Sequence, residues 1–500
     1  MEYCFKNLLQ ITLLVLGSTV CLAEPSALTV QQLKTYLPQG STLAIRVTDA
    51  DGKIRLQQNS DKLLAPASLM KLITAVASYY QLGPSFRFDT NLYKDANSAD
   101  LIMTFSGDPL FDSAALDQLL KQAKKQGLTN IDGDLLLDGS IFRGHARANG
   151  QNWADMTHCF AAPATAIAMA HNCLQATLPL LEGPVGAKLP ASLEGIIHID
   201  GALTPVTAQQ QTEQFCEPNI NKESATRYRL SGCIDRALLP LKLELAAPDS
   251  LAYVKALLQG ALARHGIKLS GDIRVGQLPE QYQLIAKYRS RPLEYYLQQM
   301  LQKSDNTIAD VLLKTMGARY YQQPGNYKNG VSALREIIKT STKIDLNNSN
   351  IVDGSGLSRL NLNDVKTFDR LLQHIQHMRD STIRDALPIA GKNGTLQYRY
   401  GMENPPLKNN VRAKTGTLSG VSNMAGFIQT QAGDILNVTV FINGFHVSPT
   451  VKNGPEDDVK NADESGTKAA PPTDKQLSEI RNSMINRFYR TLFTALYEGR

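Results

Sequence analysis

Two stretches with the pattern of β-hairpins lie at opposite ends of the chain and constrain its fold most. Near the start, two alternating apolar runs flank Asp51-Gly52 in STLAIRVTDADGKIRLQQN. Near the end, the same pattern surrounds Gly433-Asp434 in NMAGFIQTQAGDILNVTVFINGF, and DKQLSEIRNSMINRFYRTLFTALYEG then has apolar residues at helical spacing. We therefore expect both ends of the chain to meet in one antiparallel sheet flanked by helices, which is an α+β fold.

The middle of the chain differs from its two ends in its pattern of apolar and turn-forming residues. A length of 500 residues is too great for one ordinary core, so two or three domains are expected. Residues 95–287 hold short strand-like runs, such as DLIMTFSG and IDGDLLLDGSIF, separated by Gly, Pro and Asp. This pattern predicts a mostly β module of one or two subdomains, inserted between two parts of the sheet-and-helix domain, residues 24–94 and 288–500.

Two segments after the insert differ sharply in composition. The segment RPLEYYLQQMLQKSDNTIADVLLKTMGARYY predicts two helices with a polar break at Ser304-Asp305-Asn306. A polar break between two helices is a place where a catalytic loop can lie. Residues 447–475 are rich in Pro, Gly and charged residues and lack an apolar period, which is typical of a mobile surface loop.

The N-terminus has the pattern of a signal peptide. Lys6 precedes an apolar segment, and small residues at Cys21 and Ala23 predict cleavage after Ala23, so the signal covers residues 1–23. A lipoprotein reading through Cys21 is disfavoured because Val20, not a small residue, precedes it. The rest of the chain has no apolar stretch near the roughly 20 residues that span a bilayer. We expect an exported, soluble protein.

The charge pattern argues against a nucleic-acid partner. The formal net charge is +6, but it is spread thinly and forms no run of lysines or arginines with interleaved aromatic residues. At most, this balance favours peripheral contact with an anionic membrane surface. The sequence leaves the oligomeric state open, a homo-oligomer included.

Four cysteines remain after removal of the predicted signal peptide. Three pairings are open to them, and nearest-neighbour pairing would close loops of fewer than about 20 residues, each worth up to about 3 kcal/mol. A zinc site built from His158, His171 and two of the thiolates is the alternative, but its spacing lacks a tight C-x-x-C or H-x-x-x-H arm. Export to an oxidising compartment favours disulfides and no metal. The four are Cys159, Cys173, Cys216 and Cys233.

The segment LLAPASLMKLITAV places Ser68 between a proline-marked turn and an apolar run. If a helix begins near Pro66 or Ala67, Ser68 lies in its first turn, and Lys71 is about 5–6 Å away on the same face. Gly83-Pro84 ends this helix. The pattern fits a serine nucleophile with a lysine base. A non-catalytic serine near a helix start, followed by a surface lysine, would have the same sequence pattern.

A lysine base needs a special environment. An ordinary lysine has a pKa of about 10.4, and lowering it to near 7 takes roughly 4–5 kcal/mol from burial and a nearby cation. The segment VRAKTGTLSGVSNMAGF offers that cation as Lys414, followed by Thr415 and Gly416. A strand of this sequence lets a substrate backbone lie along its edge while the lysine meets a carboxylate.

Three short motifs occur in order, each in a fitting context. They are Ser68-x-x-Lys71 at a helix start, Ser304-Asp305-Asn306 between two helices, and Lys414-Thr415-Gly416 on a strand. This set is the signature of penicillin-binding proteins and serine β-lactamases. The chain resembles the D-alanyl-D-alanine carboxypeptidase and endopeptidase family, which comprises the class C low-molecular-mass penicillin-binding proteins related to penicillin-binding protein 4 (serine peptidase family S13).

The resemblance covers nearly the whole mature chain. It includes SGDPLF (106–111), GQNWADMTHCFAAPATAIAMAHNC (150–173), VDGSGLSRLN (352–361) and LPIAGKNGTLQYRYG (387–401). The long insertion between the first two motifs is a family trait that simple β-lactamases lack. The resemblance implies a transpeptidase-domain fold like that of serine β-lactamases, local pairing of the cysteines, no cofactor, and the periplasm of a Gram-negative-type bacterium.

The resemblance also implies a mechanism, residue by residue. Ser68 attacks the carbonyl of the penultimate D-alanine to form an acyl-enzyme, and Lys71 accepts its proton. Ser304 relays a proton to the leaving amine, and Asn306 holds the substrate amide. Lys414 supplies positive charge to Ser304 and to the terminal carboxylate of the substrate.

The strand that follows Lys414 completes the implied site. Thr415 also contacts the terminal carboxylate, and Gly416 leaves room for the substrate backbone. The backbone N–H groups of Ser68 and Thr417 form the oxyanion hole. Water then releases the shortened peptide. The implied partners are peptidoglycan stem peptides as substrates and β-lactam antibiotics as covalent inhibitors.

Three more residues are implied to bind the diamino acid of the stem peptide. Asp155 would meet its amino group, Arg399 its carboxylate and Phe160 its methylenes. Each residue also has a purely structural interpretation: Asp155 as a helix cap, Phe160 as part of a core and Arg399 as a member of a surface ion pair. Ser419 departs from the family, where relatives can carry a longer amide side chain, which weakens the expectation for the carboxylate.

Two other functions compete with this reading. A serine β-lactamase would share acylation, but the sequence identifies no glutamate for rapid deacylation, and a large insert suits a bulky wall substrate better. A non-catalytic peptidoglycan- or β-lactam-binding module would keep the fold without turnover, but the motif set is complete. The run Asp353-Gly354-Ser355-Gly356 lacks the G-x-S-x-G frame of hydrolases and is interpreted as a turn that supports the site.

Overall fold

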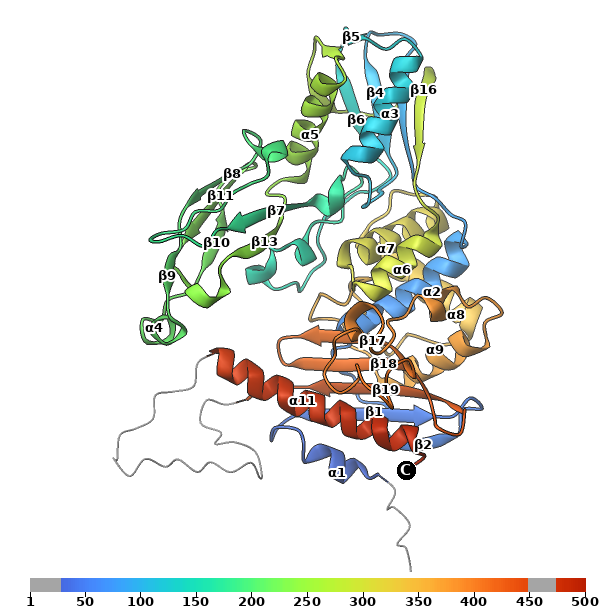
Figure 1. The fold of residues 1–500 in the computed structure, drawn as a ribbon. Helices are drawn as coiled ribbons and strands as arrows, with labels where there is room; N and C mark the ends of the chain where they lie inside the picture. Colours follow the sequence, from blue (N-terminus) through green and yellow to red (C-terminus); the bar gives the residue numbers. More distant parts are fainter. Residues whose placement is uncertain (1–27, 448–473) are drawn as a thin grey trace, which may run out of the picture.

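The computed structural model describes residues 28–447 and 474–500. The predicted signal peptide, and the predicted surface loop apart from its ends, lie outside the described residues. Figure 1 shows a lower part, in which blue and red segments from the two ends of the chain lie side by side, and an insert above it. None of the helices in these two ranges is long and apolar enough to cross a membrane.

Both ends of the chain contribute to one five-stranded antiparallel sheet, as predicted. The strand order is β17-β18-β19-β1-β2, and β1 pairs with β19 from Thr42 opposite Asn443 to Thr48 opposite Asn437. The two predicted hairpins are therefore neighbours in this sheet. Its strands are β1 (Thr42–Thr48), β2 (Ile54–Gln58), β17 (Val411–Leu418), β18 (Val421–Gln429) and β19 (Ile435–Asn443).

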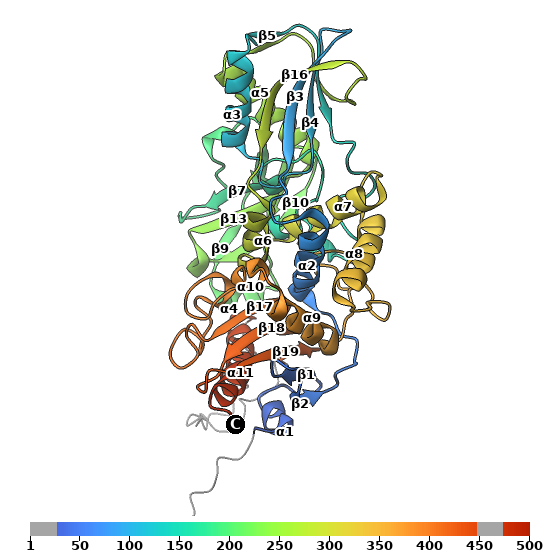
Figure 2. The same cartoon turned by 90° about the vertical axis from the view of Figure 1, so that its right-hand side faces the viewer.

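Helices cover both faces of this sheet. On β19, Phe441 packs in a core shared with α2 and α7, whereas its neighbours Val440 and Ile442 pack in a second core with α11. Burial on both faces explains why this strand reads as a nearly continuous apolar run. Figure 2 shows α2, α8 and α9 on the side of the sheet away from α11. The helices are α1 (Val30–Lys34), α2 (Met70–Leu82), α6 (Leu293–Gln302), α7 (Asn306–Tyr321), α8 (Tyr327–Thr342), α9 (Val365–His377), α10 (Thr382–Asp385) and α11 (Asp474–Tyr497).

The first and last segments of the insert together form a second five-stranded sheet. The predicted limits of the insert, residues 95 and 287, fall within β3 and β16, because these two strands pair with each other and carry the chain across the boundary. Two long helices, α3 and α5, pack on this sheet, so this half of the insert is mixed α and β rather than mostly β as predicted. Its elements are β3 (Asp89–Asp95), β4 (Leu101–Phe105), α3 (Ser113–Lys125), β5 (Asn130–Ile131), β6 (Leu135–Asp138), α5 (Ser250–Arg264), β14 (Lys268–Leu269), β15 (Ile273–Val275) and β16 (Tyr282–Arg289).

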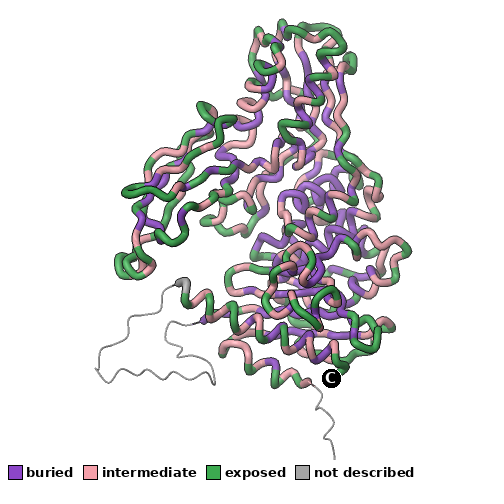
Figure 3. The backbone as a smooth tube through the Cα atoms, viewed as in Figure 1, coloured by how far each residue is buried: buried purple, intermediate pink, exposed green. Residues whose placement is uncertain are grey.

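The other half of the insert, residues 173–246, is mostly β, as expected. It consists of small sheets around two minor apolar clusters, and Figure 3 shows less buried chain here than around α2 and α7. Its elements are β7 (Cys173–Leu178), β8 (His198–Gly201), β9 (Thr204–Val206), α4 (Ala208–Glu213), β10 (Asn219–Lys222), β11 (Arg227–Ser231), β12 (Cys233–Asp235) and β13 (Leu241–Ala246).

Two disulfides join neighbouring cysteines of the insert. Cys159 is bonded to Cys173, and Cys216 is bonded to Cys233. The nearest-neighbour pairing expected from the sequence is confirmed. Because both thiols of the alternative zinc site are oxidised to a disulfide, they cannot act as thiolate ligands.

Candidate active site

Ser68 lies on a tight turn at the start of α2. The turn is a short 3₁₀ segment, Ala67–Leu69, that continues directly into α2, rather than the first turn of a regular helix. Ala67 has a positive φ of 49°. A side chain at Gly356 would place its Cβ 1.8 Å from the carbonyl oxygen of Ala67, so only glycine lets the neighbouring loop approach this turn. The turn leaves Ser68 half-buried and accessible, while Leu69 is fully buried.

Lys71 lies one turn beyond Ser68 with its side chain fully buried. Its Nζ is 3.0 Å from Ser68 Oγ, 2.6 Å from Asn306 Oδ1 and 2.6 Å from the carbonyl oxygen of Ser355. The Asp353-Gly354-Ser355-Gly356 run is thus a turn that holds the lysine. The oxygens of Asn306 and Ser355 therefore hold Lys71 Nζ beside the Ser68 hydroxyl.

Burial is the main cause of the unusual electrostatics of Lys71. It lowers the pKa of Lys71 to about 8, although the charges of Asp310, Asp353 and Asp305 act in the opposite direction. Burial in turn raises the pKa of Asp310 to about 7. A lysine with a pKa near 8 is partly neutral at physiological pH and can accept a proton.

The loop between α6 and α7 brings the second motif to the same place. Ser304 has a positive φ of 60°, and this turn directs its Oγ to Lys414 Nζ at 2.9 Å. Asp305 caps α7 by accepting a hydrogen bond from the backbone N–H of Ile308. Asn306 begins α7, so the three consecutive residues point to three different partners.

Lys414 lies on β17 and is completely buried. Its Nζ donates to Ser304 Oγ and to the carbonyl oxygen of Thr415 at 2.8 Å. Burial, and then the charge of Lys71, lower the pKa of Lys414 well below its usual range. The sequence had led us to expect burial together with a nearby cation to lower the pKa of Lys71. Burial has this effect, whereas the repulsion between the two lysines is seen in the lowered pKa of Lys414.

The same strand passes close to the serine turn. A Cβ on Gly416 would lie 2.7 Å from the carbonyl oxygen of Pro66, so glycine is needed for this approach. Thr415 is buried and donates to Thr395 Oγ1 at 2.9 Å, whereas Thr417 is exposed at the strand end. The structure therefore brings the residues of all three motifs together around Ser68.

The three residues expected to bind a diamino acid are placed differently from one another. Phe160 is 47% exposed, which excludes a core role, and its carbonyl oxygen accepts a hydrogen bond from Asn306 Nδ2 at 2.7 Å. Asp155 lies on the same segment of the insert, in a 3₁₀ turn that is capped by Asn152. Arg399 packs its guanidinium on the ring of Tyr489 in α11, 4.8 Å from the centroid, and its buried Nε has no hydrogen-bond partner.

Asp310 and Thr395 lie at the site but were not singled out from the sequence, and Asp353 was named only as part of a supporting turn. Asp310 follows Asn306 by one helical turn and accepts a hydrogen bond from the backbone N–H of Gly354, which supports the turn against Lys71. An aspartate within the apolar run of α7 is the signal that could have found it. Asp353, which is fully buried, accepts hydrogen bonds from the backbone N–H groups of Gly356 and Ser358. Thr395 carries no comparable signal in the sequence.

Comparisons with known proteins show the family of this chain. The sequence model described as the D-Ala-D-Ala carboxypeptidase 3 (S13) family matches residues 29–464. D-alanyl-D-alanine carboxypeptidase DacB of Haemophilus influenzae is 33% identical over 476 residues, covering 92% of this chain and 94% of that protein.

Solved structures show the same fold. The crystal structure of penicillin-binding protein 4 from Haemophilus influenzae is 33% identical, with a TM-score of 0.81 over 94% of this chain and 100% of that one. The same protein in complex with a β-lactam is 31% identical, with a TM-score of 0.77 and the same coverage. A family match over most of the sequence, on a shared fold, shows that this chain belongs to the D-Ala-D-Ala carboxypeptidase 3 (S13) family, as its sequence motifs had indicated.

Proposed function

We propose that this chain is a serine-type D-alanyl-D-alanine carboxypeptidase, and a DD-endopeptidase on cross-linked stem peptides, that acts through an acyl-enzyme on Ser68. The observation that carries the proposal is the 3.0 Å contact between Ser68 Oγ and Lys71 Nζ, made by a buried lysine whose pKa is lowered to about 8. A nucleophile beside a base that is partly neutral at physiological pH meets the chemical requirement for acylation.

In the acylation step, Ser68 Oγ attacks the carbonyl carbon of the penultimate D-alanine while its proton moves to Lys71 Nζ. The tetrahedral oxyanion is stabilised by the backbone N–H groups of Ser68 and Thr417. The C–N bond then breaks, and the leaving amine takes a proton through Ser304, which Lys414 contacts. In carboxypeptidase action the leaving group is D-alanine, and in endopeptidase action it is a cross-linked diamino acid.

Substrate binding helps to place the protons on the two lysines. Lys71 and Lys414 repel each other in a buried site, so their titrations are linked. The terminal carboxylate of a peptide, held by Lys414 and Thr415, favours the charged form of Lys414 and leaves Lys71 neutral. Asn306 holds the substrate amide, and its contact with Lys71 Nζ supports this role by bringing the side chain beside the proposed base. Water completes the cycle by attacking the Ser68 ester.

We extend the proposal to the substrate and its location. Asp155, Phe160 and Arg399 bind the diamino acid of the stem peptide, and the exposed Phe160 side chain beside Asn306 supports this for the methylenes. β-Lactams acylate Ser68, a role supported by the β-lactam complex of the related penicillin-binding protein 4. We place the protein in the periplasm, where peptidoglycan is its substrate.

The test is mass spectrometry of the purified protein after incubation with penicillin and, separately, with cross-linked muropeptides. We expect a stable penicilloyl adduct on Ser68, together with D-alanine release and dimer cleavage. Ser68→Ala should lose the adduct and both cleavages. Ser78→Ala is the matched control, since Ser78 is buried on the same helix and its hydroxyl donates to Met316 Sδ rather than to a residue of the three motifs, so it should keep the adduct and both cleavages.

Two results would overturn the proposal. Folded wild-type protein with neither adduct nor cleavage would leave a binding module as the better account. Continuous hydrolysis of penicillin without a lasting adduct would favour a β-lactamase.

A further inference from the structure

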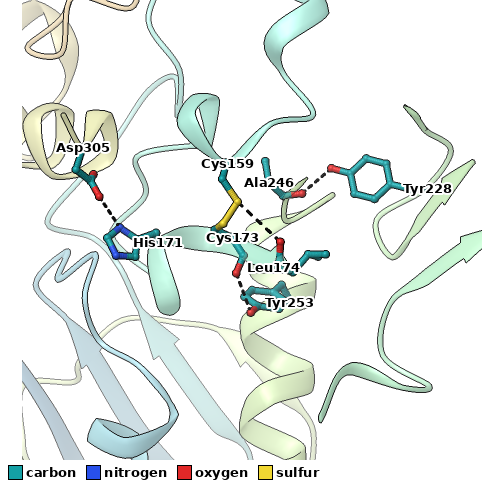
Figure 4. The surroundings of a disulfide bond; sticks show 8 residues. All are labelled: Cys159, His171, Cys173, Leu174, Tyr228, Ala246, Tyr253 and Asp305. Atoms are coloured by element: carbon teal, nitrogen blue, oxygen red, sulfur yellow. Dashed lines mark hydrogen bonds and ion pairs between the residues drawn. A yellow bond between two sulfur atoms is a disulfide. The ribbon is translucent and has the colours of Figure 1, made fainter. Parts of the chain in front are cut away.

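The insert contacts the Ser304–Asn306 loop through two neighbouring points. The carbonyl oxygen of Phe160 accepts a hydrogen bond from Asn306 Nδ2 at 2.7 Å, and His171 Nδ1 lies 3.1 Å from Asp305 Oδ2. Figure 4 shows the imidazole of His171 pointing at the Asp305 carboxylate. The central residue of the second motif is thus held by a side chain from a different part of the protein.

The backbone holds His171 in one fixed orientation. Its φ of 60° is left-handed, and its backbone N–H donates to the carbonyl oxygen of Pro109 at 2.8 Å. The next residue, Asn172, is fully buried and donates to the carbonyl oxygen of Pro163 and to Thr165 Oγ1. The Cys159–Cys173 disulfide joins the strand end after His171 to the turn that contains Phe160. A side chain presented by so constrained a backbone is suited to positioning.

The charged groups that face His171 come from three segments. Asp305 lies at the start of α7, Asp108 lies in the loop after β4, and Lys303 lies at the end of α6. Burial acts to lower the pKa of His171, but the hydrogen bond and charge of Asp305, together with the charge of Asp108, outweigh it, so the pKa is raised. The contact correspondingly keeps the pKa of Asp305 low against the effect of burial. The contact therefore favours the imidazolium form of His171 and the carboxylate form of Asp305.

We propose that His171 is a positioning residue for acylation, which holds the Asp305 carboxylate and thereby keeps Ser304 in contact with Lys414 and Asn306 in contact with Lys71. The inference rests on the proposed acyl-enzyme mechanism. It assigns to the insert a direct part in assembling the catalytic loop.

The pair also controls the charge that Lys71 experiences. Asp305 is one of the carboxylates whose charge favours the protonated form of Lys71. When protonated, His171 pairs with this carboxylate, and we infer that its positive charge offsets the effect of Asp305 on Lys71. Removal of the imidazolium leaves the carboxylate uncompensated, so the pKa of Lys71 rises and less of the neutral base is present at a given pH.

The test is the second-order rate constant for acylation by a fluorescent penicillin, measured from pH 5.5 to 9.5. For His171→Gln we expect a rate about tenfold lower at pH 7, the size of a lost charge-assisted hydrogen bond. We also expect the acidic limb of the profile to move to higher pH by about half a unit. His171→Arg keeps the cation and should recover the rate to within about twofold, because guanidinium also binds carboxylate.

His265→Gln is the matched control. His265 Nε2 lies 2.9 Å from Asp117 Oδ1, so it forms a second histidine–aspartate pair in the insert, and Asp117 belongs to α3, far from the catalytic loop in Figure 1. This variant should acylate like the wild type. Thermal unfolding of all variants shows whether each is folded.

The outcomes separate the two proposals. A wild-type protein that is not acylated on Ser68 refutes the proposed function itself. An acylated wild type with an unchanged rate and pH profile in His171→Gln refutes only the role of His171. A third outcome is an equal loss of rate in His171→Gln and His171→Arg, with no movement of the acidic limb. It would show that His171 is a purely structural residue and would also refute its proposed positioning role.

Discussion

Two buried lysines on neighbouring helices have similar electrostatics but different partners. Burial lowers the pKa of Lys71 on α2 and that of Lys314 on α7, to about 8 in each case, and the charge of Asp310 acts against burial at both. Lys71 contacts Ser68 Oγ, whereas Lys314 donates to the carbonyl oxygens of His145 and Ala164. A lowered pKa therefore reports burial, and only the contact with a nucleophile distinguishes a base.

The contacts of Lys314 show what a buried lysine does without a reacting partner. Its Nζ lies over the ring of Tyr327, 4.4 Å from the centroid, and its two backbone acceptors belong to the insert. Lys314 thus joins α7 of the lower part to the insert. The same residue type serves chemistry at one site and cohesion at the other, and identical substitutions at the two sites test this difference.

Lys71→Met has the largest expected effect. Methionine has a similar shape but cannot accept the proton of Ser68, so the acylation rate with fluorescent penicillin should fall by about 10³-fold or more. Stopped-flow or gel-based acylation, corrected for folded protein, measures this. A residual rate within tenfold of the wild type would remove Lys71 from its proposed role as base.

Lys314→Met should reverse the pattern, with acylation within about threefold of the wild type but reduced stability. The change leaves the buried carbonyl oxygen of Ala164 without this donor, at roughly 1–3 kcal/mol, and removes a partly buried hydrogen bond to the carbonyl oxygen of His145. Lys314 titrates near 8 when folded and near 10.5 when unfolded, so the unfolded chain binds more protons between these values and wild-type stability rises with pH there.

The loss of stability in Lys314→Met should therefore grow from pH 7.5 to pH 9.5. Urea unfolding at the two pH values measures it, with Lys71→Met as the comparison. Wild-type stability combined with lost acylation would show that Lys314 belongs to the catalytic site and would end the contrast.

Asp310→Asn should give the smallest effect and acts on the charge that both lysines share. Asparagine keeps an acceptor for the backbone N–H of Gly354 but removes the negative charge. The pKa of Lys71 should fall, so the acidic limb of the acylation profile should move to lower pH by up to about one unit.

The control for this change is Asp138→Asn. Asp138 is a buried aspartate of the insert that accepts hydrogen bonds from the backbone N–H groups of Ser140 and Leu278. Its replacement should leave the acylation profile unmoved. A shift to higher pH in Asp310→Asn would contradict the sign of the electrostatic argument.

The sequence predicted the parts of the fold that depend on local pattern. The hairpins, the break between α6 and α7 and the pairing of the cysteines all follow from short-range periodicity, turn residues and spacing. Helix α3 was missed, although Leu116, Leu119, Leu120 and Ala123 have helical spacing, because short strand-like runs dominate the surrounding segment.

The candidate site was predictable only where a motif carries it. Ser68, Lys71 and Lys414 belong to short patterns whose chemistry can be read residue by residue. The run that contains Asp353 was interpreted as a supporting turn, but its contact with Lys71, like that of His171 with Asp305, joins segments far apart in the chain, and no local pattern reports that proximity. Burial was expected to lower the pKa of Lys71, but the opposing charges of Asp310 and Asp353 were not, because they depend on how the core assembles.

The sheet that joins the two chain ends also sets an order of assembly. The backbone N–H of Ala65, just before the serine turn, donates to Asn443, a partner 378 residues away in sequence. The insert, by contrast, closes on itself when β16 pairs with β3. During synthesis the insert can complete its core while β1 still waits for β19 with its edge open to wrong partners. Ser68 is thus synthesised early, but the strands beside its turn come last, so we expect the site to form only when almost the whole chain exists.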